Sequence, residues 1–519
     1  MSTAPRWLRA GVALLILTGM AFVLAHAALD RYLRAEAGVA LDRIGRGESR
    51  FAFEFERTRD LISETAEGVR ADRIEQGIWR ATLPDGRANV RLNLRGLWLD
   101  ARRFDFLLTR IHSSAAGELV LIFDEPGQLQ QNAVRLDLSA GWNDLHLPLT
   151  EMPWRSLDET DTDLVFVSQP WGGRTGAVGE FRLYFSLPPG SEIGLDYLRF
   201  VERAVATGQT PVHRPWARME WISVEEARTR LAAQRPLRGS PEVRVGILLP
   251  LYRDTPERLL DLRDAALRRD AETLFWPAYA ETPGQDTRYP AMPAGATLAW
   301  WMLGLWALIL LLLRWRLPLE RRGAQLLDLC VGWGPLLGLV ALLALPETPG
   351  APLLVLIGMQ LAYLLSRVRL APWRLVGDAA AWSQALSITV VGVLALVFAA
   401  YASDFLRWPG GQRLGQYLPF VAIQQILLLG YLRPASERLW PSGARWLAAA
   451  LFGALHAPNF ALMLLSGLGA WIWLGQYTRT RALLPVMATH YVLGLAAITC
   501  LPPWLLYSAE ASLRYYTVQ

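Results

Sequence analysis

The residues most able to carry chemistry in this sequence are polar side chains inside long apolar stretches. His456 and His490 lie in two such stretches, and Gln424 and Gln425 are neighbours in a third. Polar groups are costly inside a bilayer, so those that occur in apolar segments are candidates for function. Imidazole can exchange a proton near neutral pH, and an amide can orient water or donate to an oxyanion. We therefore predict that a helical bundle gathers these four side chains around one buried site.

Asn459 joins this candidate catalytic set because it follows His456 by three residues. Residues three apart lie on one face of a helix, and Phe452 lies one turn earlier on the same predicted face. The two imidazoles, His456 and His490, could also bind a water molecule or a divalent metal ion. The alternative is that each histidine makes an interhelical hydrogen bond to an amide on a neighbouring helix.

These segments resemble the CPBP family, the CAAX-protease and bacteriocin-processing intramembrane proteins. The family pattern is Glu-Glu-x-x-x-Arg, then Phe-x-x-x-His, then His-x-x-x-Asn or Asp, on successive parts of one helical bundle. Phe452 and His456 match the second motif, and His490 matches the histidine of the third. The resemblance covers about residues 380–505 and implies an intramembrane endopeptidase, in which a glutamate working with histidine activates water.

The sequence departs from that pattern at four positions. Gln424 and Gln425 replace the two glutamates, Leu429 replaces the arginine, and Gly494 replaces the final Asn or Asp. A carboxylate can accept a proton and an amide cannot, so the rate expected from such a site falls by roughly 10²–10⁴-fold or more. Asp328 is the only acid that an apolar run could immerse, and we expect it at the membrane interface.

Three functions therefore stay open. The first is a CPBP-like intramembrane endopeptidase with altered catalysis, acting on a membrane-protein substrate. The second is a catalytically inactive membrane scaffold or regulator that recognises an envelope glycan or protein. The third is a component of envelope polysaccharide assembly. The net charge of +5 does not indicate nucleic acid, because the arginines cluster beside hydrophobic segments.

The apolar segments predict a multi-pass protein whose main partner is the lipid bilayer. The C-terminal domain, residues 296–519, contains about eight runs of suitable length. These runs are 296–313, 324–345, 352–366, 382–402, 416–432, 446–461, 463–477 and 483–503. Every second loop between them carries arginines, which places those loops in the cytoplasm. We expect a bacterial inner-membrane protein with a cytoplasmic N-terminus and a large periplasmic domain.

The N-terminal run, residues 1–28, is expected to be an uncleaved transmembrane anchor, although Ala25-His26-Ala27 could also end a signal peptide. The only two cysteines, Cys330 and Cys500, fall in predicted membrane segments. The periplasmic domain is therefore expected to fold without a disulfide.

That domain, residues 29–212, shows strand-like alternation of apolar and polar residues between about residues 86 and 201. Within it, residues 141–149, followed later by residues 194–198, resemble the galactose-binding-like sandwiches. The pattern predicts an antiparallel β-sandwich of jelly-roll type. Trp142, Trp154 and Trp171 could stack on sugar rings, or they could pack the sandwich itself. The pattern in residues 213–295 predicts a small α/β appendage or stalk. Ser223, with Glu226 three residues later, is expected to cap a helix there.

Overall fold

The computed structural model divides the chain into two compact units. One comprises Met1–Tyr32, Leu251–Leu262 and Pro290–Gln519, and the other comprises Leu33–Pro250 and Arg263–Tyr289. We call them the membrane unit and the outer unit, and each is described by itself. The structure describes residues 6–55, 61, 68–94, 96–126, 131–157, 165–168, 170–208, 219–239, 243–277, 322–342, 360, 363–364, 367–368, 374–408, 411–510 and 515–516.

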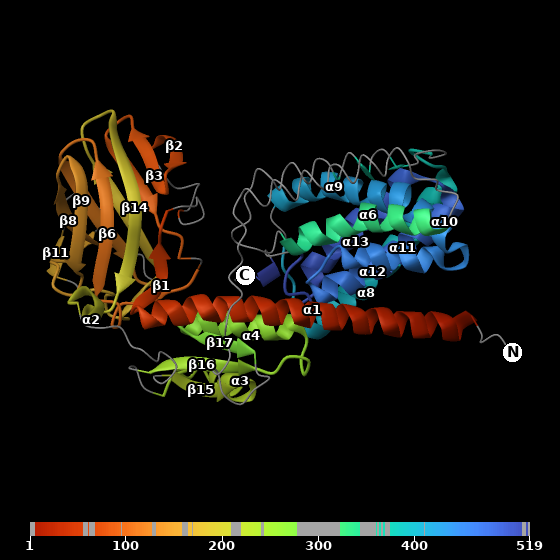
Figure 1. Cartoon of the computed structure of the whole chain (residues 1–519), viewed down its shortest axis with the longest axis horizontal. Helices are drawn as coiled ribbons and strands as arrows, with labels where there is room; N and C mark the ends of the chain where they lie inside the picture. The colour runs from red at the N-terminus through yellow and green to blue at the C-terminus, as the bar shows by residue number, and fades with distance from the viewer. Residues whose placement is uncertain are drawn as a thin grey trace. The chain divides into compact units, whose positions relative to one another are not determined.

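The outer unit contains a sandwich of two six-stranded antiparallel sheets (Figure 1). In the first, the β14 sheet, the strand order is β2-β3-β14-β6-β9, and β1 also pairs with β14. Its strands are β1 (Glu48–Phe53), β2 (Arg70–Glu75), β3 (Ile78–Leu83), β6 (Phe106–Ser113), β9 (Gly141–Pro148) and β14 (Ser191–Val201).

In the second, the β7 sheet, the order is β11-β10-β8-β7-β13-β4. Its strands are β4 (Arg87–Arg91), β7 (Gly117–Asp124), β8 (Gln131–Leu138), β10 (Arg155–Leu157), β11 (Val165–Ser168) and β13 (Glu180–Ser186). A two-stranded ribbon joins β5 (Leu99–Asp100) to β12 (Ala177–Val178), and the short helix α2 (Arg203–Ala206) follows β14.

The sandwich forms because its strands alternate. Along β6, Leu107, Thr109, Ile111 and Ser113 are buried while the residues between them are partly exposed. Side chains of a strand point to opposite faces, so one face of each sheet can close a shared core. The prediction of a β-rich domain is therefore confirmed.

A second part of the outer unit is a three-stranded parallel sheet, ordered β15-β16-β17. Its strands are β15 (Met219–Ser223), β16 (Arg244–Leu249) and β17 (Leu274–Pro277). Along the chain, α3 (Val224–Ala232) follows β15, and α4 (Pro256–Arg269), whose residues up to Leu262 belong to the membrane unit, precedes β17. The Ser223 hydroxyl accepts a hydrogen bond from the Glu226 backbone N–H at 3.2 Å, as the capping pattern predicts. Ala37, from the later part of α1 (Arg6–Gly45), packs on Leu274 and Trp276.

The membrane unit contains four helical stretches long and apolar enough to cross a bilayer, counted over the described residues. They are Ala379–Ser403, Tyr417–Leu439, Phe460–Thr480 and Leu483–Cys500. The first of them, α8, exposes Leu386, Val391 and Phe398 on its surface, which suits contact with lipid. A multi-pass membrane protein is thus confirmed.

The other predicted apolar runs match described helices only in part. The run 296–313 lies outside the described residues, and only Gln360, Tyr363 and Leu364 of the run 352–366 are described. The run 324–345 lies largely in α6 (Arg322–Leu342). The run 446–461 is not one helix, because α11 ends at Ala454 and α12 begins at Phe460. The N-terminal run is helical, but helix α1 continues past residue 28 to Gly45. Its role as an anchor stays a prediction.

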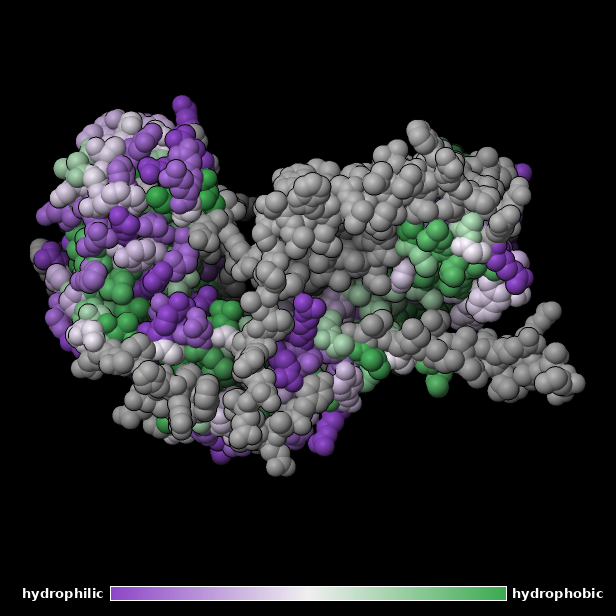
Figure 2. Space-filling model, viewed as in Figure 1, coloured by the Kyte–Doolittle hydropathy of each residue, from purple (hydrophilic) through white to green (hydrophobic). Residues whose placement is uncertain are grey.

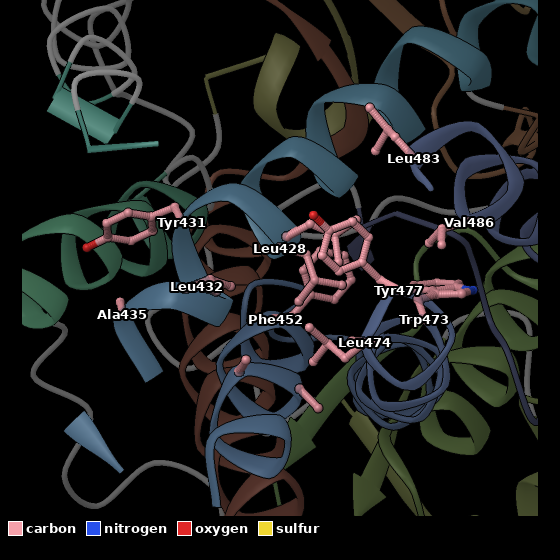
Figure 3. Packing of buried hydrophobic residues seen from close by; sticks show 14 of the residues in the cluster. Leu428, Tyr431, Leu432, Ala435, Phe452, Trp473, Leu474, Tyr477, Leu483 and Val486 are labelled. Atoms are coloured by element: carbon pink, nitrogen blue, oxygen red, sulfur yellow. The ribbon is translucent and has the colours of Figure 1, made fainter. Parts of the chain in front are cut away.

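The bundle elements are α6, α8 (Ala379–Ser403), α9 (Gly411–Ile426), the π-helix η3 (Leu427–Leu432), α10 (Arg433–Leu439), the 3₁₀ turn η4 (Pro441–Gly443), α11 (Ala444–Ala454), α12 (Phe460–Thr480) and α13 (Leu483–Cys500). Figure 3 shows a core shared by several of these elements, in which η3 contributes Leu428 and Leu432 and α12 contributes Trp473 and Leu474. A π-turn widens a helix locally and often occurs at functional sites. Here it begins two residues after Gln425.

Candidate functional site

The structure brings the two glutamines and the two predicted histidines together as two separate pairs. Nε2 of Gln424 lies 3.3 Å from Nε2 of His456, and Nε2 of Gln425 lies 2.8 Å from Nδ1 of His490. Consecutive residues of an α-helix point about 100° apart, so neighbouring amides on α9 reach histidines on different elements. The Gln425 pair is buried, whereas His456 and Gln424 are partly exposed.

The hydrogen bonds indicate which nitrogen of His456 carries the proton. Its Nδ1 lies 3.0 Å from the carbonyl oxygen of Phe452, and a carbonyl can only accept. Nδ1 therefore donates, and in the neutral ring Nε2 holds the lone pair. That lone pair faces the Gln424 amide, which donates to it. The proton-accepting atom of this imidazole is thus already engaged.

The prediction that Asn459 shares a helix face with His456 is wrong. Helix α11 ends at Ala454, and α12 begins only at Phe460. Pro458 lies between them, and proline has no N–H to continue a helix. Asn459 instead caps α12, because its Oδ1 accepts from the Leu462 backbone N–H at 2.9 Å.

The amide nitrogen of Asn459 is also engaged away from the histidines. Its Nδ2 donates to the backbone carbonyls of Ser508 at 2.6 Å and Glu510 at 3.2 Å. Both amide ends therefore hold the junction between α12 and the C-terminal segment. This is a structural role.

Aromatic rings surround His490. The Trp473 ring stacks on its imidazole at 3.8 Å between centroids, and the rings of Tyr417 and Phe452 approach edge-on at 6.2 Å and 6.5 Å. A Cβ atom at Gly494 would overlap the hydroxyl of Tyr417. Tyr417 thus occupies the space in which the Asn or Asp of the CPBP pattern would begin.

Sequence reasoning missed Trp473 and Tyr417 as parts of this site. Trp473 is one of several tryptophans in the apolar runs, and neither its type nor its spacing distinguishes it from the others. Tyr417 precedes Gln424 by seven residues, a spacing that returns to the same helix face, and this was the available signal.

The donor set does not fit a metal ion. No group of three or more His, Cys, Asp or Glu side chains able to hold an ion occurs within the described ranges. The lone pair of His456 faces an amide donor, and Nδ1 of His490 also faces an amide nitrogen. Zinc needs at least three protein nitrogen, sulfur or carboxylate ligands.

Asp328 is fully buried among protein groups, and its place at the membrane interface stays a prediction. Tyr363 donates to its Oδ1 at 2.7 Å, and Arg438 donates to its Oδ2 at 3.2 Å. The Nε of Arg367 lies 3.2 Å from Oδ1, and Tyr431 donates to the Asp328 backbone carbonyl. Ion pairing and hydrogen bonds make this burial tolerable, and they tie α6 to η3 and α10.

The three candidate sugar-stacking tryptophans separate into two environments. Trp154 and Trp171 are 1% and 5% exposed, and they stack on each other at 5.4 Å inside the sandwich core. Trp142 lies on β9 and is 38% exposed. Only Trp142 can therefore meet a ligand from solution.

No family model matches the chain, and no curated protein matches it. The CPBP resemblance therefore rests on the motif residues alone. Among solved structures, the chain is similar to PfGH50B, with 10% identity and a TM-score of 0.21 over 27% of this chain, and it spans only 22% of the length of that one.

Two carbohydrate-binding modules of Clostridium thermocellum are also similar. The family 11 module in complex with a β-1,3-1,4-mixed-linked tetrasaccharide has 13% identity and a TM-score of 0.22, covering 29% of this chain and 96% of the module. The family 11 module of the cellulosomal cellulase Lic26A-Cel5E has 10% identity and a TM-score of 0.20, covering 26% and 84%. Such low TM-scores carry no argument about function.

Proposed function

We propose that this protein is a membrane-embedded recognition protein whose CPBP-like bundle serves as a scaffold and does not hydrolyse peptide bonds. The outer sandwich is its recognition domain. The arginine-bearing loops support a cytoplasmic N-terminus and a periplasmic sandwich in a bacterial inner membrane. The observation that carries the proposal is that both histidines of the candidate site are paired with amides.

Peptide hydrolysis by water needs a group that removes a proton from the water molecule. A carboxylate beside each histidine could serve, but Gln424 and Gln425 cannot accept that proton. The lone pair of His456 is occupied by the Gln424 amide. Asp328 is already bound by Tyr363, Arg367 and Arg438. The pairs therefore act as neutral hydrogen bonds that join α9 to the segment after α11 and to α13.

The test is cleavage of a fluorogenic transmembrane peptide by the full-length protein in lipid nanodiscs. The native protein is compared with Gln424→Glu/Gln425→Glu and with His456→Ala/His490→Ala. We expect no turnover by the native protein above the level of the histidine double variant. Turnover that disappears when the histidines are removed would overturn the proposal.

One observation favours a second function, a glutamine-assisted endopeptidase. Both histidines converge on one pair of adjacent amides, and the ring of Phe452 contacts both of them. An amide can donate to the oxyanion of a tetrahedral intermediate. The same assay separates the two functions, because only the endopeptidase cleaves with Gln424 and Gln425 in place.

A further inference from the structure

The outer face of the β14 sheet, which points away from the sandwich core, carries a dense cluster of aromatic and charged side chains. Its register places Gly194 of β14 opposite His112 of β6, and His112 opposite Trp142 of β9. The next row places Tyr197 opposite Arg110, and Arg110 opposite Asp144. A bulge between Leu195 and Tyr197 adds Asp196 to this cluster.

Arg110 lies at the centre of this face and links its members. Its NH1 donates to Oδ2 of Asp196 at 3.2 Å, and its Nε lies 3.4 Å from Oδ1 of Asp144. Its guanidinium also lies over the Trp142 ring, 4.5 Å from the centroid. These contacts hold both carboxylates and the indole in place. The cluster is preorganised and still open, because Arg110 and Asp144 side chains are 40% and 59% exposed.

Each arginine of this cluster is paired with at least one carboxylate. Arg110 is paired with two carboxylates, and Arg199 makes two hydrogen bonds of 2.8 Å to the carboxylate of Glu54. Arg199 also lies over the Tyr197 ring, at 4.9 Å. These groups comprise two arginines and three carboxylates, so no excess of positive charge favours an anionic polymer.

A protein partner fits this face poorly. Cores of protein interfaces are apolar and depleted of charge, whereas charged residues crowd around Trp142 here. The sandwich surface visible in Figure 2 is also largely hydrophilic, with small separate apolar patches. Exposed rings beside fixed donors and acceptors suit a ligand with apolar ring faces and many hydroxyl groups.

We infer that the outer face of the β14 sheet binds a neutral carbohydrate chain. Trp142 is the stacking platform, and Arg110, Asp144 and Asp196 bind the hydroxyl groups. The inference rests on the proposed recognition role of the sandwich and is independent of the chemistry in the membrane bundle. Trp154 and Trp171 play no part in it, because they are buried.

The experiment is binding of the full-length protein in nanodiscs to immobilised polysaccharides: neutral glucan, mannan, galactan and xylan, with anionic alginate as the comparison. We expect retention on at least one neutral polymer, and an affinity about tenfold or more weaker in Trp142→Ala, the size of effect typical for a central aromatic contact. Trp98→Ala is the matched control, because Trp98 is 47% exposed in the same domain but lies between β4 and β5. Unchanged thermal unfolding of both variants shows that the sandwich still folds.

Salt separates the candidate ligands. Binding to a neutral chain should change little between low and high ionic strength, whereas binding to alginate would weaken as salt screens the charges. The inference would be overturned if the protein bound none of the neutral polymers, or if the native protein and Trp142→Ala bound equally well. Peptide cleavage in the nanodisc assay would instead overturn the proposed function and leave the sugar site intact.

Discussion

Replacement of Asn459 tests whether this residue holds α12 and the C-terminal segment together and so lies outside the histidine site. Replacing it with alanine removes the cap of α12 and two hydrogen bonds to the carbonyls of Ser508 and Glu510. A lost cap costs about 1 kcal/mol and each net hydrogen bond about 0.5–1.5 kcal/mol, so Asn459→Ala should destabilise the membrane unit by about 2–4 kcal/mol.

Asn459→Ser is the matched variant. Serine caps a helix as well as asparagine does, but it has no amide nitrogen to donate to the two carbonyls. It should therefore recover about 1 kcal/mol of the loss and remain less stable than the native protein.

Unfolding can be followed with a thiol-reactive dye. Cys500 is 3% exposed at the end of α13, whereas Cys330 is exposed and is replaced by serine in every sample. The dye then reports only on opening of the bundle around Cys500. Native stability in Asn459→Ala would refute the structural role. If Asn459→Ser were as stable as the native protein, the contribution of the hydrogen bonds to the C-terminal segment would be refuted.

Two further predictions concern other contacts of the membrane unit. Burial raises the pKa of Glu257, which accepts from the Ala461 N–H and the Tyr515 hydroxyl, so the folded state binds its proton more tightly than the unfolded chain does. The stability of the folded state should therefore fall as pH rises from the ordinary glutamate pKa through this raised value. Glu257→Gln, measured in the same thiol assay, should remove this pH dependence. An identical pH dependence in the variant would contradict the assignment to Glu257. Gly494→Ala should lower the free energy of unfolding by about 1–3 kcal/mol, because the added Cβ meets Tyr417. Tyr417→Ala in the same chain should relieve that loss. Independent, additive losses in the double variant would argue against the contact.

The class of each part could be predicted from local sequence because local patterns encode it. Alternation along β6 predicts one buried face, and Ser223 with Glu226 predicts a helix start. Long apolar runs predict membrane spans because the bilayer core requires about 20 apolar residues of helix. These features depend on residues close together in the chain.

The break between α11 and α12 was also indicated in the sequence, by a signal that competes with residue spacing. The spacing of His456 and Asn459 suggested one helix face, while Pro458 between them indicated a break. The structure follows the proline, which moves Asn459 from the candidate site to the cap of α12.

Sequence by itself determined that two histidines and two glutamines lie in apolar segments and that a β-rich domain precedes them. It left two roles open for three tryptophans, stacking on sugar rings or packing a core. Tertiary structure decided that Gln424 pairs with His456 and Gln425 with His490, and that Trp142 faces outward while Trp154 and Trp171 do not. The physical reason is that a residue type sets which contacts are possible. Which partner it meets depends on strand register, helix rotation and the packing of segments far apart in the chain.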